Sequence, residues 1–203
     1  MTQSKLQNDN FSVCLVKVDV PIDYPTLAFL LRFSPLEKQQ RISRQRVKKI
    51  ADAMAVGGAL VRYMLRENFC VPIDAQIAYG KFGKPYLPDY PKIHFNISHS
   101  GKFVACAVCN RPIGIDVQEI TPYRPNVAAR VFSSTDLEQI STSHNQAEEF
   151  TKIWTQKEAY LKMLGVGFRT GTQIVKFSHP LKMQTQKYQT ALLSIAIDGQ
   201  SST

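Results

Sequence analysis

Three oxygen-bearing side chains, Asp116, Gln118 and Glu158, have types and spacing that suit metal-assisted phosphate chemistry. Residues 113–117 are predicted to begin a strand, and side chains two apart on a strand point to the same face, so Asp116 and Gln118 should lie together. A predicted helix over about 146–164 would deliver Glu158. Two carboxylates and an amide oxygen are hard ligands that suit Mg²⁺, which keeps several waters and relies on substrate phosphates.

Each of these residues also has an ordinary structural interpretation. Asp116 could be a turn or strand-end residue, and Glu158 could form a surface salt bridge with Lys162, one helical turn later. His99 follows a predicted strand, where a histidine is more often a surface or hydrogen-bonded residue. Taken singly, the residues leave both interpretations open.

The elements that must position these residues indicate an α+β protein. In the first part of the chain we predict a strand over 11–20, a helical region starting at the N-cap Ser34 and a short strand over 76–79. An antiparallel meander should follow over 93–98, 102–109 and 113–117. In the second part we predict a short helix starting at the capping box 135–138, a helix over 146–164 that ends at Gly165, and strands over 172–178 and 190–197. Residues 121–125, with two prolines, mark the passage into the second part.

Basic side chains crowd the first helical region. The chain has a net charge of +9, which suggests a polyanionic partner such as nucleic acid, a phosphate-rich cofactor, an anionic membrane or an acidic protein. A solvated helix face is the equally weighted alternative. The residues concerned, with no acid among them, are Lys38, Arg41, Arg44, Arg46, Lys48 and Lys49.

The composition is that of a soluble globular protein, with 44% hydrophobic and 20% charged residues. Residues 1–10 are polar and lack the apolar core of a secretory signal, and the apolar run over 53–61 is too short to span a membrane, so a cytoplasmic protein is expected. Cys106 and Cys109 should point to opposite faces of a strand, which favours ordinary buried thiols over a metal or redox motif.

Three segments stand out by their order and separation: Asn96-Ile97-Ser98-His99-Ser100-Gly101, Gly114-Ile115-Asp116-Val117-Gln118 and Phe150-Thr151-Lys152-Ile153-Trp154-Thr155-Gln156-Lys157-Glu158-Ala159-Tyr160-Leu161-Lys162. Together they resemble the signature blocks of the 4′-phosphopantetheinyl transferases, and of the larger surfactin-type group within them. The resemblance implies two similar α/β halves with pseudo-two-fold symmetry. We expect a flexible tail at 1–10, an N-terminal half over 11–112 and a C-terminal half over 113–203, with the active site in the cleft between them.

The resemblance implies transfer of 4′-phosphopantetheine from coenzyme A to a serine of an apo acyl or peptidyl carrier protein, with release of 3′,5′-ADP. It implies Mg²⁺ held by Asp116, Glu158 and the pyrophosphate of coenzyme A, with Gln118 acting directly or through a water. Glu158 is the candidate to accept the serine proton, Lys162 to stabilise charge on the phosphates, and His99 to contact a phosphate.

The resemblance also implies a set of coenzyme A contacts, with two departures from the family pattern. Gln118 stands where a second carboxylate is usual, and Ala53 stands where many relatives carry an arginine, so Arg44, Lys48 or Lys49 could substitute at the 3′-phosphate. The expected contacts are Lys38, Arg41, Arg62, Lys84, Ser98, His99 and Lys162.

Two other interpretations compete with the enzyme. A degenerate homologue would bind coenzyme A or a carrier protein without turnover, which Gln118 motivates. A nucleic-acid-binding protein would use the basic helix but leaves Asp116, Glu158 and His99 unexplained. We favour the enzyme, acting on coenzyme A and an acidic carrier protein, with no nucleic-acid or membrane partner. A monomer is expected, because the two halves can build the cleft within one chain.

Overall fold

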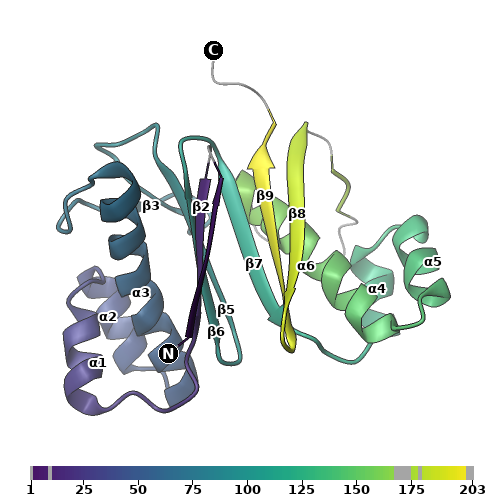
Figure 1. The fold of residues 1–203 in the computed structure, drawn as a ribbon, viewed down its shortest axis with the longest axis horizontal. Coiled ribbons are helices and arrows are strands. Elements are labelled where there is room, and N and C mark those ends of the chain that lie inside the picture. Colours follow the sequence, from purple (N-terminus) through teal and green to yellow (C-terminus); the bar gives the residue numbers. More distant parts are fainter. Residues whose placement is uncertain (1, 9–10, 167–174, 178–179, 200–203) are drawn as a thin grey trace.

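The protein is built around two β-sheets, each covered by a long helix. The structure is a computed structural model that describes residues 2–8, 11–166, 175–177 and 180–199. Figure 1 shows α1, α2 and α3 on one side of the paired sheets and α4, α5 and α6 on the other. The helices are α1 Tyr24–Leu31, α2 Leu36–Ser43, α3 Lys48–Phe69, α4 Pro125–Val131, α5 Ser134–Thr142 and α6 Gln146–Leu164. The strands are β1 Thr2–Asn8, β2 Phe11–Lys17, β3 Ala78–Tyr79, β4 Pro85–Tyr86, β5 His94–Ser100, β6 Phe103–Cys109, β7 Ile113–Glu119, β8 Leu181–Tyr188 and β9 Ala191–Asp198.

The N-terminal half is a four-stranded sheet of order β1-β2-β6-β5 with α3 packed on one face. Met64 and Leu65 of α3 lie in one buried cluster with Val104 of β6, and burial of this apolar surface holds the helix on the sheet. Gly57 allows the helix to approach closely, because a Cβ at this position would lie 2.5 Å from Cδ1 of Ile97. At Gly57, α3 therefore packs directly against a side chain of β5, the strand that carries Ser98 and His99.

The C-terminal half is a three-stranded sheet of order β7-β9-β8 with α6 packed against β7 and β9. Gly114 of β7 lies directly under α6, since a Cβ there would be 2.0 Å from the backbone oxygen of Ala159. Only a residue without a side chain permits this approach. Gly114 thus brings the segment of α6 that carries Glu158 and Lys162 close to the strand that carries Asp116.

The inner faces of the two sheets share a second core. Ala105 of β6, Ile115 of β7 and Ile195 of β9 belong to this single buried cluster, in which Cys109 also lies. Cys106 belongs instead to the core under α3. The prediction that Cys106 and Cys109 point to opposite faces of one strand is confirmed, and both side chains are buried.

The third strand of the predicted meander joins the other sheet. β5 and β6 pair antiparallel as expected, but β7 pairs with β9, with Asp116 opposite Ser194. The physical reason is that the apolar side chains of β7 fill the core between the two sheets. On the edge of β7 that has no strand partner among the described residues, a side chain of β5 accepts a hydrogen bond from the β7 backbone. The junction between the halves therefore lies between β5 and β7.

The expected flexible tail at 1–10 is wrong over most of its length. Residues 2–8 form β1, which pairs antiparallel with β2 from Thr2 opposite Lys17 to Asn8 opposite Phe11. A strand at the edge of a sheet offers unpaired N–H and C=O groups, and the backbone of a further segment can satisfy them. Composition alone gave no sign of this pairing.

Other boundaries also differ from expectation. The first helical region is two helices, α2 and α3, and the N-cap of α2 is Pro35 rather than Ser34. Helix α5 begins with a capping box formed by Ser133 and Asp136, two residues earlier than predicted. The strand predicted over 172–178 lies largely outside the described residues, and 175–177 are not in a strand. Helices α1 and α4 and strand β8 were not predicted from the sequence.

Within the described ranges, no helix combines the length and the apolar character needed to cross a membrane.

Candidate active site

Side chains of β5 hydrogen-bond to the backbone of β7 and so join the two halves. Asn96 Oδ1 accepts from the N–H of Ile115 at 3.0 Å, and Ser100 Oγ accepts from the N–H of Glu119 at 3.2 Å. Residues two apart on a strand share a face, so Ser98 also points at this junction. The first two sequence motifs are therefore held against each other by the polar residues within them.

A hydrogen-bonded network of three residues lies at this junction. Lys162 Nζ donates to Asp116 Oδ1 at 2.6 Å and to Ser98 Oγ at 2.9 Å, and Ser98 Oγ donates to the same Asp116 oxygen at 2.7 Å. Asp116 is 5% exposed, so its charge depends on these partners. All three sequence motifs contribute one member to the network.

Glu158 lies one helical turn before Lys162 but is not its ion-pair partner. Lys162 pairs with Asp116 across the junction, which replaces the surface salt bridge within α6 that the sequence allowed. The pKa of Glu158 is raised to about 7. Burial is the largest cause, the negative charge of Asp116 acts in the same direction, and the positive charge of Lys162 opposes both. The carboxylates of Asp116 and Glu158 thus lie close enough to repel each other.

His99 is an exposed residue on the wall of the junction, close to positive charges. Partial desolvation of its ring is the largest cause that lowers its pKa, and the nearby charges of Lys162 and Lys38 lower the pKa further. These effects favour the neutral imidazole, which can donate one hydrogen bond and accept another.

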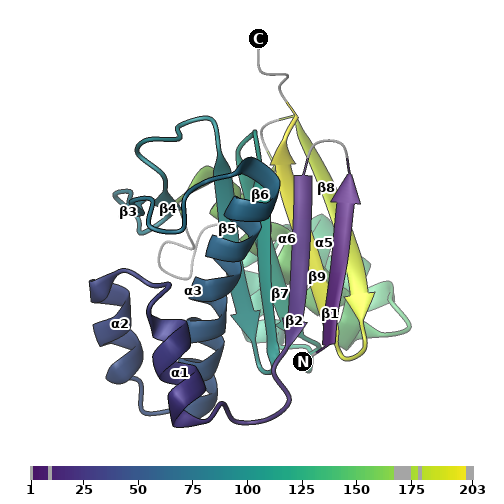
Figure 2. The same cartoon turned by 60° about the vertical axis from the view of Figure 1, so that its left-hand side comes forward.

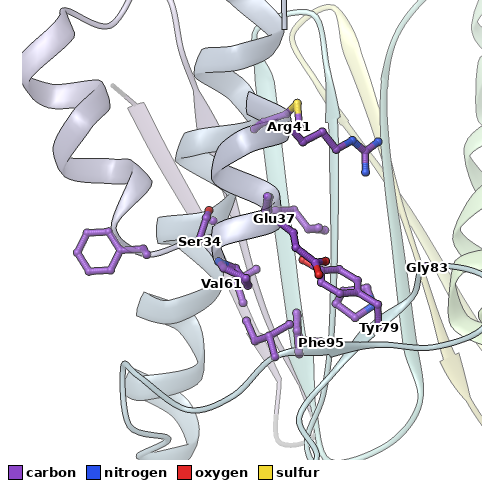
Figure 3. A pocket seen from close by; sticks show the side chains of 15 residues that line it. Ser34, Glu37, Arg41, Val61, Tyr79, Gly83 and Phe95 are labelled. Carbon is purple, nitrogen blue, oxygen red and sulfur yellow. The ribbon is translucent and has the colours of Figure 1, made fainter. Parts of the chain in front are cut away.

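The residues of the network open onto a cavity of about 420 Å³ between the halves. A second cavity of about 370 Å³ adjoins it and shares Lys38, Arg41, Met54 and Ile97 with it. In Figure 2, α2 and the β3–β4 hairpin lie on the same side of α3, and Figure 3 shows the second cavity that they enclose. The first cavity is lined by Lys38, Arg41, Met54, Ile97, Ser98, His99, Asp116, Gln118, Trp154, Glu158 and Lys162.

Lys38 and Arg41 stand where the two cavities meet. Burial is the main cause that lowers the pKa of Lys38, and the charges of Arg41 and Arg62 act in the same direction. Cations held close together in a hollow are a favourable site for phosphate groups, which would relieve their repulsion.

The donor set at the junction fits a divalent cation of the magnesium type. Asp116, Gln118 and Glu158 line one cavity and offer oxygen atoms, and a cation would relieve the repulsion between the two carboxylates. The set has only two carboxylates, and among the described residues no group of three or more His, Cys, Asp or Glu side chains could hold a metal. Such a site would leave positions for water and substrate phosphate.

Two of the expected coenzyme A contacts lie outside the cavities. Arg62 is buried, and it donates to the carbonyl oxygens of Phe33 and Ala75 at 3.3 and 2.6 Å. Lys84 Nζ donates to the carbonyl of Met163 at 2.5 Å, at the carboxyl end of α6, where a cation is favourable. Both side chains hold loops in place in this structure.

The suggested substitutes at the 3′-phosphate do not line either cavity. Lys48 forms an ion pair with the buried carboxylate of Asp52 at 2.6 Å, and Asp52 also accepts from the N–H of Ile22. Arg44 and Lys49 are exposed and are absent from both linings. Of the six basic residues in the first helical region, only Lys38 and Arg41 line these two cavities.

Several cavity residues escaped the sequence analysis. Met54 and Trp154 line the first cavity, and Glu37 and Tyr79 line the second. The only available signal for Trp154 was its place in the third motif. Lys157 of the same motif is buried and pairs with Asp136 at 2.8 Å, so it supports the fold and not the cavity.

Comparison of the sequence with known proteins finds relatives for both halves of the chain. Residues 23–111 match the family described as 4′-phosphopantetheinyl transferase, N-terminal, and residues 112–200 match the 4′-phosphopantetheinyl transferase superfamily. A 4′-phosphopantetheinyl transferase of Bacillus subtilis is 36% identical over 135 residues, which is 64% of this chain and 60% of that protein. The 4′-phosphopantetheinyl transferase Sfp of Bacillus subtilis (strain 168) is 32% identical over 155 residues, which is 75% of this chain and 69% of that protein.

A more distant relative is the L-aminoadipate-semialdehyde dehydrogenase-phosphopantetheinyl transferase of Xenopus laevis, 28% identical over 170 residues, or 74% of this chain and 56% of that protein. The chain thus spans 56 to 69% of the length of these three relatives. The matched families cover both halves in the order in which the structure builds them. The chain belongs to the 4′-phosphopantetheinyl transferase superfamily and, within it, to the surfactin-type group.

Proposed function

We propose that this protein transfers the 4′-phosphopantetheine group of coenzyme A to a serine of an apo acyl or peptidyl carrier protein and releases 3′,5′-ADP. The observation that carries the proposal is the network of Ser98, Asp116 and Lys162, which stands with Glu158 on the wall of a cavity between the halves. Membership of the superfamily supports the reaction class.

The two adjoining cavities fit the two ends of coenzyme A. The nucleotide end belongs in the cavity of about 370 Å³, which is lined largely by apolar side chains. Its phosphates would meet Lys38 and Arg41 where the cavities join, and the pyrophosphate would reach Ser98, His99 and Lys162. This placement sets the scissile bond beside Asp116 and Glu158.

In the reaction, the serine oxygen forms a bond to the β-phosphorus, and the bond from that phosphorus to the bridging oxygen of the pyrophosphate breaks. Glu158 accepts the serine proton, directly or through a water. Lys162 stabilises the negative charge that develops on the leaving phosphate, and His99 orients the phosphates by a hydrogen bond. Ser98 and Asp116 hold the ammonium group of Lys162 in position.

Asp116 and Glu158 would hold Mg²⁺, with Gln118 as a ligand directly or through a water. The bound cation would neutralise charge on the pyrophosphate oxygens, as in other phosphoryl transfers.

The partners follow from the same chemistry. A net charge of +9 and the basic residues of α2 suit coenzyme A and an acidic carrier protein, without a role for nucleic acid or a membrane. Because one chain builds both walls of the cavity, a monomer suffices. A cytoplasmic location is compatible with the use of coenzyme A, an intracellular cofactor.

The test is intact-mass spectrometry of an apo carrier protein incubated with this protein, coenzyme A and Mg²⁺, beside a control with a chelator. The expected result is a metal-dependent mass gain of one phosphopantetheine group. If coenzyme A binds but several apo carriers gain no mass, the degenerate homologue that Gln118 suggests is correct instead. If coenzyme A does not bind and DNA or RNA does, in a salt-sensitive way, the enzyme is excluded.

A further inference from the structure

A carboxylate, Glu37, lines the cavity assigned to the nucleotide, although that ligand is an anion. Glu37 belongs to the first turn of α2, and Arg41 follows it by one helical turn, at a spacing that commonly gives an ion pair. Among the described residues, however, Glu37 forms no ion pair. The carboxylate is therefore available to a ligand.

The directions of the two side chains differ. Figure 3 shows the carboxylate of Glu37 turned toward Tyr79, whereas the guanidinium of Arg41 extends away from both. Arg41 also lines the neighbouring cavity, which Glu37 and Tyr79 do not. The negative group thus borders the nucleotide cavity alone, and the positive group stands where that cavity meets its neighbour.

The surroundings of Glu37 suit a flat aromatic base. Val61, Ile77 and Phe95 line the same cavity and do not line its neighbour. Apolar walls with few polar groups are typical of sites that orient a small ligand. An ionised carboxylate can only accept hydrogen bonds, so the ligand group that meets it must be a donor and must carry no negative charge.

We propose that Glu37 is a specificity-determining residue that selects the adenine base of coenzyme A by accepting a hydrogen bond from its 6-amino group. This inference rests on the proposed function, because it assumes that the nucleotide end occupies this cavity. The 6-amino group supplies the strong donors of adenine, and the base is neutral. Hydrogen bonds to a charged acceptor are stronger than neutral ones, so a base without the amino group leaves the carboxylate unsatisfied.

The experiment is a thermodynamic cycle that removes the amino group from the ligand and the carboxylate from the protein. Isothermal titration calorimetry compares adenosine 3′,5′-bisphosphate with purine riboside 3′,5′-bisphosphate, in which hydrogen replaces the amino group. The proteins are the wild type, Glu37→Ala, Glu37→Gln and the control Glu67→Gln, an exposed acid on α3 outside both cavities.

We expect the wild type and Glu67→Gln to bind the adenosine ligand about ten-fold more tightly than the purine ligand. In Glu37→Ala the preference should fall to within about two-fold, and Glu37→Gln, whose neutral amide oxygen still accepts, should be intermediate. Glu37 also sits in the first turn of α2, where an acid can stabilise a helix. That role alone would change both affinities equally and leave their ratio unaltered.

An equal ratio in the wild type and Glu37→Ala would overturn the inference. The transfer assay separates this outcome from failure of the proposed function. If a carrier protein gains phosphopantetheine from coenzyme A while the ratio of the two bisphosphate affinities does not change on substitution of Glu37, only the inferred adenine selectivity is wrong. If neither bisphosphate binds the wild type and no transfer occurs, the nucleotide placement and the inference fail together.

Discussion

The two halves contribute opposite net charges to the cavity between them. The N-terminal half supplies Lys38 and Arg41 from α2. The C-terminal half supplies the carboxylates of Asp116 from β7 and Glu158 from α6 beside a cation, Lys162. The cationic wall suits the holding of an anionic substrate, and the acidic wall suits proton acceptance and a metal. Substitutions on the two walls should therefore affect different steps, with affinity changed on one side and turnover on the other.

The largest effect should come from Asp116→Asn. The substitution keeps the size of the side chain but removes the charge that Lys162 and a metal both need, so kcat should fall by about 10²- to 10³-fold. The carrier-labelling assay by intact mass measures the rate, with Asp89→Asn, an exposed acid away from the cavities, as control. A rate within about three-fold of the wild type would show that the acidic wall does not carry the chemistry.

Glu158→Gln should alter the pH dependence of stability in metal-free buffer. The folded protein raises the pKa of Glu158 to about 7 from an ordinary value of 4.5, so it binds more protons than the unfolded chain between these pH values. The wild type should therefore lose stability relative to Glu158→Gln as the pH rises from about 5 to 8, by about 1–2 kcal/mol. Urea unfolding at each pH measures the difference, and a constant difference would contradict the assigned environment.

On the cationic wall, Arg41→Gln should weaken substrate binding more than turnover. Loss of one phosphate contact should raise KM for coenzyme A about ten-fold and change kcat by less than about three-fold. Arg44→Gln is the matched control, because Arg44 follows on the same helix end but lines neither cavity. Equal effects of the two substitutions would mean that only the overall charge of α2 matters.

The smallest effect should come from Gln118→Glu, which adds a third carboxylate to the acidic wall. The dissociation constant for Mg²⁺, measured by calorimetry without substrate, should fall about three- to ten-fold, because each added charge strengthens a cation site. Turnover at saturating Mg²⁺ should change by less than about three-fold. An unchanged metal affinity would place Gln118 outside the metal site.

The sequence allowed much of the local arrangement to be predicted. The two-residue spacing of Asp116 and Gln118 placed both on one wall, and the same rule separated Cys106 from Cys109. Helix α6 ends where Gly165 adopts a left-handed conformation, at φ 74°, as expected of a C-cap glycine. These features depend on backbone periodicity and on residues close in sequence, so they can be inferred without the fold.

Contacts between distant segments could not be predicted in this way. Arg62 and Lys84 were expected at the substrate, but their nearest acceptors in the fold are backbone carbonyls of Ala75 and Met163. Which acceptor a long cationic side chain reaches depends on how loops pack, and sequence spacing carries no information about that. The same limit hid β1, whose partner β2 is identified only by the register of the sheet.

By itself, the sequence determined the types of chemical group in this protein and the family to which it belongs, because three ordered motifs and two periodicities are local properties. Only the tertiary structure decided that Lys162 pairs with Asp116 and not with Glu158, that β7 leaves the meander for the second sheet, and that Glu37 turns from Arg41 toward Tyr79. The physical reason is that burial and packing across the two halves can favour a partner that is distant in sequence over one that lies a single helical turn away.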